Sequence, residues 1–126
     1  MKHILLIFIL IGTHFALSAQ DEEVYTVVER MPRYKGGNAA MMEYLKTNIK
    51  YPQKARDANI SGRVFLEVII AKDSTITDVK VIRRVGMGCD DEAIRVVKSM
   101  PDWISGKQGG ESVNVKYVIP VNFSLE

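Results

Sequence analysis

The sequence predicts an α+β domain, in which helices pack on one face of a small antiparallel sheet. Residues 113–123 alternate apolar and polar side chains, which is the pattern of a long half-buried strand. Two further β-rich runs, 63–70 and 75–82, are separated by the turn Lys72-Asp73-Ser74 and form a hairpin. Hairpin strands pair antiparallel, and the other apolar segments have helical spacing, so the elements fit an α+β architecture.

The first half of the chain predicts a short strand, a helix and a helical turn. Residues 24–28 are β-branched and aromatic, as in a short strand. The turn Gly36-Gly37-Asn38 ends in a residue suited to cap a helix. An apolar stripe at helical spacing follows and is expected to face the core. It comprises Met41, Met42, Leu45 and Ile49. Tyr51-Pro52 ends this helix, and a short second helix is expected over 53–58.

The second half predicts one more helix before the long strand. Asp90, Asp91 and Glu92 place negative charge at a helix start, where capping rather than catalysis is expected of them. Pro101 ends the helix. Trp103 fits either a core position or an exposed recognition site, and we expect the core. Residues 106–110 are expected to form a glycine-rich loop that lacks the order of a phosphate-binding loop.

The N-terminal residues follow the pattern of a secretory signal peptide. A short positive head precedes the apolar run 4–11, and small residues follow in 16–19. The apolar run is shorter than the roughly 20 residues needed to cross a bilayer. We therefore expect residues 1–19 to be removed and residues 20–126 to form one exported domain. Cleavage before Ala19 and retention of the segment as a membrane anchor are the alternatives.

Composition argues against several classes of function. The chain has 17 basic and 15 acidic residues with no basic block beyond Arg83-Arg84, so neither nucleic acid nor an anionic membrane is the expected main partner. His3 and His14 both lie in the predicted signal peptide, which leaves the domain without a histidine base or metal ligand. Cys89 is expected to be a small buried hydrophobe, with a reactive thiol as the alternative.

The expected function is therefore protein binding without a cofactor, metal or small-molecule substrate. No nucleophile in the domain has a recognisable general base, so an enzyme is not expected. The long last strand has no obvious partner beyond the hairpin. An exposed strand edge can bind an extended peptide by main-chain hydrogen bonds, which makes this strand the candidate binding element.

A series of landmarks runs in order through residues 24–125. They are Tyr51-Pro52, Ala55, Ile60 with Gly62-Arg63-Val64, Ala93, Met100-Pro101-Asp102-Trp103, Gly106-Lys107-Gln108-Gly109-Gly110, Val113, Pro120 and Phe123. The series resembles the TonB C-terminal domain family. The upstream residues 28–32 and Gly36-Gly37 resemble the version of this domain common in Bacteroidetes-type bacteria. Ser105 and Asp73-Ser74 depart from the family, which usually has proline and Asp-Gly at these places.

The resemblance implies a periplasmic domain of two helices packed on a three-stranded antiparallel sheet. In the family, this domain binds the TonB box of outer-membrane TonB-dependent receptors in energy-dependent uptake. The box adds as a strand beside the last sheet strand, close to the segment around Tyr51-Pro52. The residues expected to bind the partner are Tyr51, Pro52, Val113, Asn114, Val115, Lys116 and Tyr117.

The resemblance covers the receptor-facing end of a complete energy transducer. Neither the transmembrane helix that engages the inner-membrane motor nor the long proline-rich spacer is expected in this chain. The leading hypothesis is a soluble periplasmic domain that binds receptor peptides, or modulates transducers and so has other TonB-system components as partners, without itself transmitting force. The alternative is a minimal transducer that retains residues 1–19 as its anchor.

Overall fold

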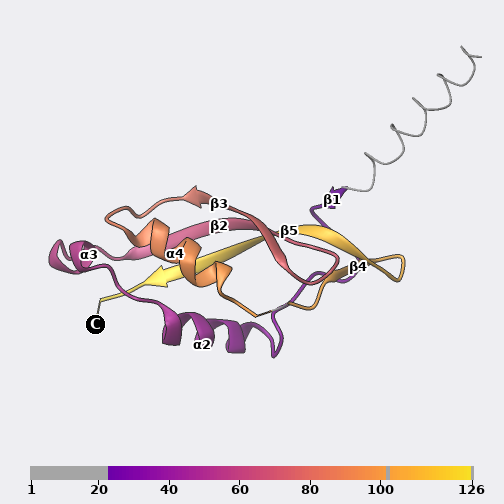
Figure 1. The fold of residues 1–126 in the computed structure, drawn as a ribbon, viewed down its shortest axis with the longest axis horizontal. Helices are drawn as coiled ribbons and strands as arrows, with labels where there is room; N and C mark the ends of the chain where they lie inside the picture. The colour runs from indigo at the N-terminus through magenta and orange to yellow at the C-terminus, as the bar shows by residue number, and fades with distance from the viewer. Residues whose placement is uncertain (1–22, 102, 126) are drawn as a thin grey trace, which may run out of the picture.

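The computed structural model describes residues 23–101 and 103–125, so the predicted signal peptide lies outside the described residues. The described part contains three helices, which are α2 (Asn38–Asn48), α3 (Gln53–Asp57) and α4 (Cys89–Lys98). The strands are β1 (Val24–Tyr25), β2 (Gly62–Ile70), β3 (Ile76–Arg83), β4 (Gly106–Gln108) and β5 (Glu111–Phe123). Helices and strands are arranged as an α+β domain, as predicted (Figure 1). None of the helices in this part of the chain is long and apolar enough to span a membrane.

The sheet is built around β5. This strand pairs antiparallel with β2 from Gly62 opposite Phe123 to Ile70 opposite Val115, and β2 pairs with β3 in the predicted hairpin. The sheet order is β1-β5-β2-β3, and β4 also pairs with β5. The expectation of a three-stranded, purely antiparallel sheet is corrected here. The sheet has five strands and is mixed, because β1 runs parallel to β5 and residues 106–108 form a strand.

Strand β4 lies within the segment predicted to be a loop. Gly106 pairs with Val113, and a methyl group on Gly106 would lie 2.8 Å from the Val115 side chain and 3.1 Å from the Arg30 carbonyl oxygen. Glycine is required here because two neighbouring segments approach its backbone closely, which is one of the uses of glycine inside a strand. The composition of this segment therefore indicates crowding rather than an open loop.

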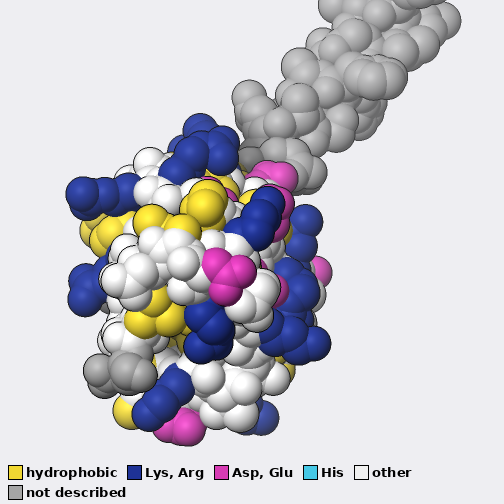
Figure 2. All heavy atoms as spheres, turned by 90° about the vertical axis from the view of Figure 1, so that its left-hand side faces the viewer, with side chains coloured by type: hydrophobic (Ala, Val, Ile, Leu, Met, Phe, Trp, Pro, Cys, Tyr) yellow, Lys and Arg dark blue, Asp and Glu magenta, His cyan; other side chains and the backbone are white. Residues whose placement is uncertain are grey.

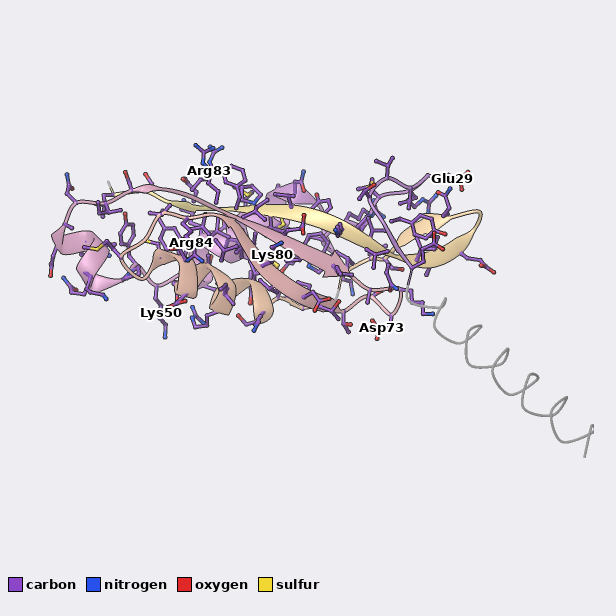
Figure 3. All side chains as sticks on the ribbon, turned by 90° about the horizontal axis from the view of Figure 1, so that it is seen from above. Glu29, Lys50, Asp73, Lys80, Arg83 and Arg84 are labelled. Atoms are coloured by element: carbon purple, nitrogen blue, oxygen red, sulfur yellow. The ribbon has the colours of Figure 1, made fainter. Side chains whose placement is uncertain are left out.

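The core lies between one face of the sheet and the helices. In Figure 3, which views the molecule from above, α4 runs along one side of the strands. Fully buried side chains come from β2, β5 and α4, and they include Val64, Leu66, Val68, Ile70, Ile119, Val121, Ala93, Val96 and Val97. From α2, Met41 and Leu45 are buried, whereas Met42 is 47% exposed. The prediction that Met42 faces the core is wrong, because adjacent helix residues are about 100° apart and Met41 occupies the core side.

Two predictions about helix starts are also corrected. Gly37, rather than Asn38, precedes the first helical residue of α2, and no side-chain cap bond forms there. The Asp90 carboxylate accepts hydrogen bonds from the N–H groups of Val85 at 2.8 Å and Gly86 at 3.0 Å. Asp90 thus fixes the loop before α4 instead of capping the helix itself. All three acids do lie in the first turn of α4, where the helix dipole favours them.

Glu92 links α4 to the segment that follows α2, and its contribution to stability should depend on pH. Its carboxylate accepts bonds from Arg95 Nη2 and from the Lys50 backbone N–H, both at 2.6 Å. Hydrogen bonding to Arg95, and then to Lys50, lowers the pKa of Glu92 below its usual 4.5. A lowered pKa in the folded state means that stabilisation is complete above about pH 4.5 and is lost as the pH falls through the folded-state pKa. We expect Glu92→Gln to melt at a lower temperature than the parent at pH 7, and the difference to shrink towards pH 3 in thermal melts.

Ser74 should be replaceable by glycine with a gain in stability. Ser74 lies in the hairpin turn with φ +75°. This is the left-handed region of the backbone, which residues other than glycine adopt at a cost in free energy. The Asp73 carboxylate holds this turn by accepting bonds from the Thr75 N–H and hydroxyl. We expect Ser74→Gly to raise the free energy of unfolding by about 0.5–1 kcal/mol, measured by urea denaturation. An equal or lower midpoint would show that the turn is not strained by Ser74.

Candidate functional site

Strand β5 has one edge that is paired along its length and one that is largely free. Residues 115–123 pair with β2 along the first edge. On the opposite edge β1 pairs only with Asn114 and Val115. Strand β4 pairs with residues 111–113, at the start of β5. Among the described residues, no strand covers the outer edge of β5 from Lys116 to Phe123. This stretch is long enough to accept an added strand of ordinary length.

Pro120 indicates which residues of β5 present their main-chain groups to this free edge. Proline has no N–H to donate. A paired strand therefore accommodates proline at a residue whose backbone nitrogen points away from the neighbouring strand. Pro120 lies opposite Phe65 of β2, and the pairing continues on both sides of it. The even-numbered residues Lys116, Val118 and Asn122 therefore direct their N–H and C=O groups outward, because this direction alternates along a strand.

A groove of about 480 Å³ adjoins the end of this edge. Met42, Leu45, Lys46 and Ile49 line one side, and Tyr51, Asn122, Phe123 and Ser124 line the other. The surface of the groove is mainly apolar, with Lys46 as its charged residue. Figure 2, which faces this end of the molecule, shows exposed apolar side chains among lysine and arginine side chains. An apolar side chain on an added strand could be buried here.

Tyr51 is the best-fixed side chain of the groove. Its ring meets the Phe123 ring edge-on, with centroids 5.6 Å apart, and the Arg56 guanidinium lies 5.1 Å from its centroid on the α3 side. The Tyr51 hydroxyl donates a hydrogen bond to the Ile60 carbonyl oxygen. Desolvation by burial, followed by the neighbouring Cys89, raises the pKa of Tyr51, and Arg56 opposes this effect. The ring therefore forms a rigid wall between the groove and the core.

The seven sequence-predicted site residues fall into two groups at opposite ends of β5. Tyr51 contacts Phe123, and Pro52, which precedes α3, lies near Gly88. The other five lie at the β1 end of the strand. Val113 pairs with Gly106 in β4, Asn114 and Val115 pair with β1, and Lys116 and Tyr117 begin the free stretch. Eight residues of strand, or about 27 Å, separate Val115 from Phe123.

Except for Tyr51, the groove side chains were missed by sequence reasoning. Met42 and Lys46 come from α2 and Ile49 follows it, while Asn122 and Phe123 end β5 and Ser124 follows it. The signal that was available is the adjacent pair Met41 and Met42, because two neighbouring helix residues do not face the same core. One of them must lie at the surface.

Cys89 is fully buried, as predicted for a small hydrophobe. Burial, followed by the charge of Asp90, raises the pKa of its thiol and keeps it in the unreactive protonated form. We expect Cys89 to react with a thiol reagent at neutral pH only as fast as the chain unfolds. Stopping the labelling reaction at successive times and weighing the products by mass spectrometry measures this rate. Cys89→Ser should leave peptide binding unchanged. Fast labelling of the folded chain would contradict the buried, inert assignment.

The described residues hold no group of three or more metal-ligating acidic, cysteine or histidine side chains. Their distinctive feature is a free strand edge beside an apolar groove. The chain is thus a small α+β domain with an open strand edge, and in proteins generally such edges are where extended chain segments can add to a sheet.

Comparison with known proteins identifies the family. The family model described as Gram-negative bacterial TonB protein C-terminal matches residues 47–125, and the chain belongs to this family. The NMR solution structure of the Helicobacter pylori TonB C-terminal domain is similar in fold. It has 25% sequence identity and a TM-score of 0.52, and the match covers 70% of this chain and 92% of that chain. A structure of a longer fragment of the same domain matches with 22% identity and a TM-score of 0.47, covering 68% and 79%. No curated protein matches the chain.

Proposed function

We propose that this chain binds the TonB box of an outer-membrane TonB-dependent receptor by strand addition at the outer edge of β5. The observation that carries the proposal is the free main-chain edge from Lys116 to Phe123, beside the groove at Met42 and Tyr51. The peptide's main chain would bond to the even-numbered residues. Its side chains on the core side would approach the groove. The role is binding, with no chemical step.

The proposed site adjusts the expectation from sequence. Lys116 and Tyr117 belong to the free edge, and Tyr51 belongs to the groove. Val113, Asn114 and Val115 take part only if the incoming strand extends towards β1, because these residues already pair with β4 and β1. Pro52 precedes α3 and does not line the groove.

We propose a periplasmic location, with residues 1–19 removed as a signal peptide. The receptor-facing domain would then bind receptors without itself transmitting force. Mass spectrometry of the chain from the periplasmic fraction tests this location. An N-terminus near Gln20 supports it, whereas an intact N-terminus in the inner membrane supports the anchored minimal transducer.

Titration with synthetic TonB-box peptides tests the binding proposal. We expect Met42→Lys to weaken peptide binding about five- to tenfold, because it places a charge in an apolar groove. Met87→Lys is the matched control, since Met87 has a similar exposure of 44% but lies in the loop before α4. A scrambled peptide of the same composition should bind more weakly than the TonB box. If the parent and Met42→Lys bind the TonB box with equal affinity, the groove does not take part in peptide binding.

A further inference from the structure

The face of the sheet opposite the helices carries an apolar strip that crosses two strands. On β2, Val64, Leu66 and the following alternate residues are fully buried, so Phe65 points to the opposite face. Phe65 lies opposite Pro120 in the pairing of β2 with β5, and Val118 follows on the same side of β5. Val118 is 44% exposed. Phe65 and Pro120 are half-buried, so the strip from Phe65 through Pro120 to Val118 is partly open to solvent in the described part of the chain.

A hollow of about 540 Å³ lies at one end of this strip, between the start of β2 and the end of β3. Its lining includes the arginines Arg63, Arg83 and Arg84 and the apolar residues Ile60, Phe65 and Val85. The Arg83 guanidinium carbon lies 5.8 Å from the centroid of the Phe65 ring. This cation–π contact restrains the Arg83 side chain before any ligand arrives. Arg83 projects from the side of the sheet away from α4 (Figure 3).

The three arginines of this hollow form no salt bridge with the acids of the described residues. Among residues 23–101 and 103–125, the salt bridge present joins Glu92 to Arg95 on α4. Asp90 is hydrogen-bonded to the lining, because its two carboxylate oxygens accept the N–H groups of Val85, in the lining, and of Gly86. Arg63, Arg83 and Arg84 are all exposed. Because the chain as a whole has 17 basic and 15 acidic residues, this concentration of charge is local.

We propose that the hollow binds the phosphate group of an amphiphilic phosphate ester, with the apolar part of the ligand on the strip from Phe65 to Val118. Guanidinium groups match phosphate oxygens by paired hydrogen bonds, and a phosphate can satisfy more than one arginine. The apolar walls and the adjoining strip would remain uncovered by a bare phosphate ion. A phosphate attached to an apolar body fits both parts. The hollow lies on the opposite side of β2 from the binding edge of β5, and the strip reaches β5 at Pro120 and Val118 on the face away from the helices. The proposal does not rest on the peptide proposal.

NMR titration of the ¹⁵N-labelled chain tests the proposal with three phosphate probes. They are inorganic phosphate, glycerol 1-phosphate and monomeric dihexanoyl phosphatidic acid. We expect saturable amide shifts at Gly62, Phe65 and Arg83 with all three probes. Dihexanoyl phosphatidic acid should bind at least fivefold more tightly than the other two and should also shift Val118. Binding should weaken as ionic strength rises, because exposed charges are screened.

Two variants and one control locate the site. Arg63→Gln and Arg83→Gln should each weaken binding of dihexanoyl phosphatidic acid about five- to tenfold, as expected for the loss of an exposed charge-assisted bond. Lys98→Gln, an exposed substitution at the end of α4, should not change it. Both arginine variants should bind TonB-box peptides like the parent, which separates this site from the proposed peptide edge.

Three outcomes would overturn the proposal. Absence of saturable shifts at the hollow would remove the site. Equal affinity for all three phosphates would show that the apolar strip does not contribute to binding. Binding of a hexaglutamate peptide, but of none of the phosphates, would assign the arginines to an acidic segment of a protein instead.

Discussion

Replacing Trp103 by alanine is expected to lower the free energy of unfolding by about 3–5 kcal/mol. The side chain is 3% exposed. Its ring meets Tyr34 edge-on at 5.7 Å between centroids and Tyr117 at 5.3 Å. Trp103 therefore joins the segment before α2 to the middle of β5, and alanine would leave a cavity between them. Urea denaturation followed by circular dichroism measures the loss.

Two further variants separate packing from other roles of Trp103. The Trp103 Nε1 donor is buried without a hydrogen-bond partner, so Trp103→Phe gives up no hydrogen bond and should cost much less than alanine. Met42→Ala is the exposed control and should have little effect on stability. An unchanged melting temperature for Trp103→Ala, combined with lost peptide binding, would instead assign the ring to recognition.

A proline series along β5 is expected to divide by residue parity. Lys116→Pro places proline where the N–H points away from β2, next to the short pairing with β1, so it should keep the ladder with β2 and reduce TonB-box binding several-fold. Tyr117→Pro removes a bond inside the sheet and should destabilise the fold by about 3 kcal/mol or more. Thermal melts and peptide titrations of each variant measure the two effects.

Tyr117→Ala is the control for the second substitution, because Tyr117 also loses its contact with Trp103. The proline variant should melt well below the alanine variant. Full TonB-box affinity in a folded Lys116→Pro variant would argue against strand addition at this edge. Destabilisation by Lys116→Pro equal to that by Tyr117→Pro would reverse the assignment based on Pro120.

Most of the helices and strands could be predicted from local sequence patterns. The period of two through residues 113–123 identified β5, and the turn at Asp73-Ser74 identified the β2–β3 hairpin. Both depend on neighbours in sequence, which is why they could be predicted from sequence alone. The burial of Trp103 and Cys89 also followed from residue type.

The missing parts depend on contacts between distant segments. The parallel pairing of β1 with β5 places Val24 beside Asn114, and no local pattern encodes that choice. The groove combines one face of α2 with the end of β5, so its lining emerges only when the two elements are packed together. For the same reason, the prediction could name Tyr51 and Lys116 but could not recognise that β5 separates them.

The position of β5 at the centre of the pairing has a consequence for how the chain folds. The Asn114 amide donates to the Glu23 carbonyl oxygen across 91 residues of sequence, whereas the β2–β3 hairpin closes locally. Non-local pairing slows folding, because the entropy of closing long loops is lost before the contacts form. A nascent chain that stops short of β5 can assemble only the hairpin and isolated helices. Folding should therefore be a late, concerted event, which would keep the polypeptide in a threadable state during the export that its predicted signal peptide implies.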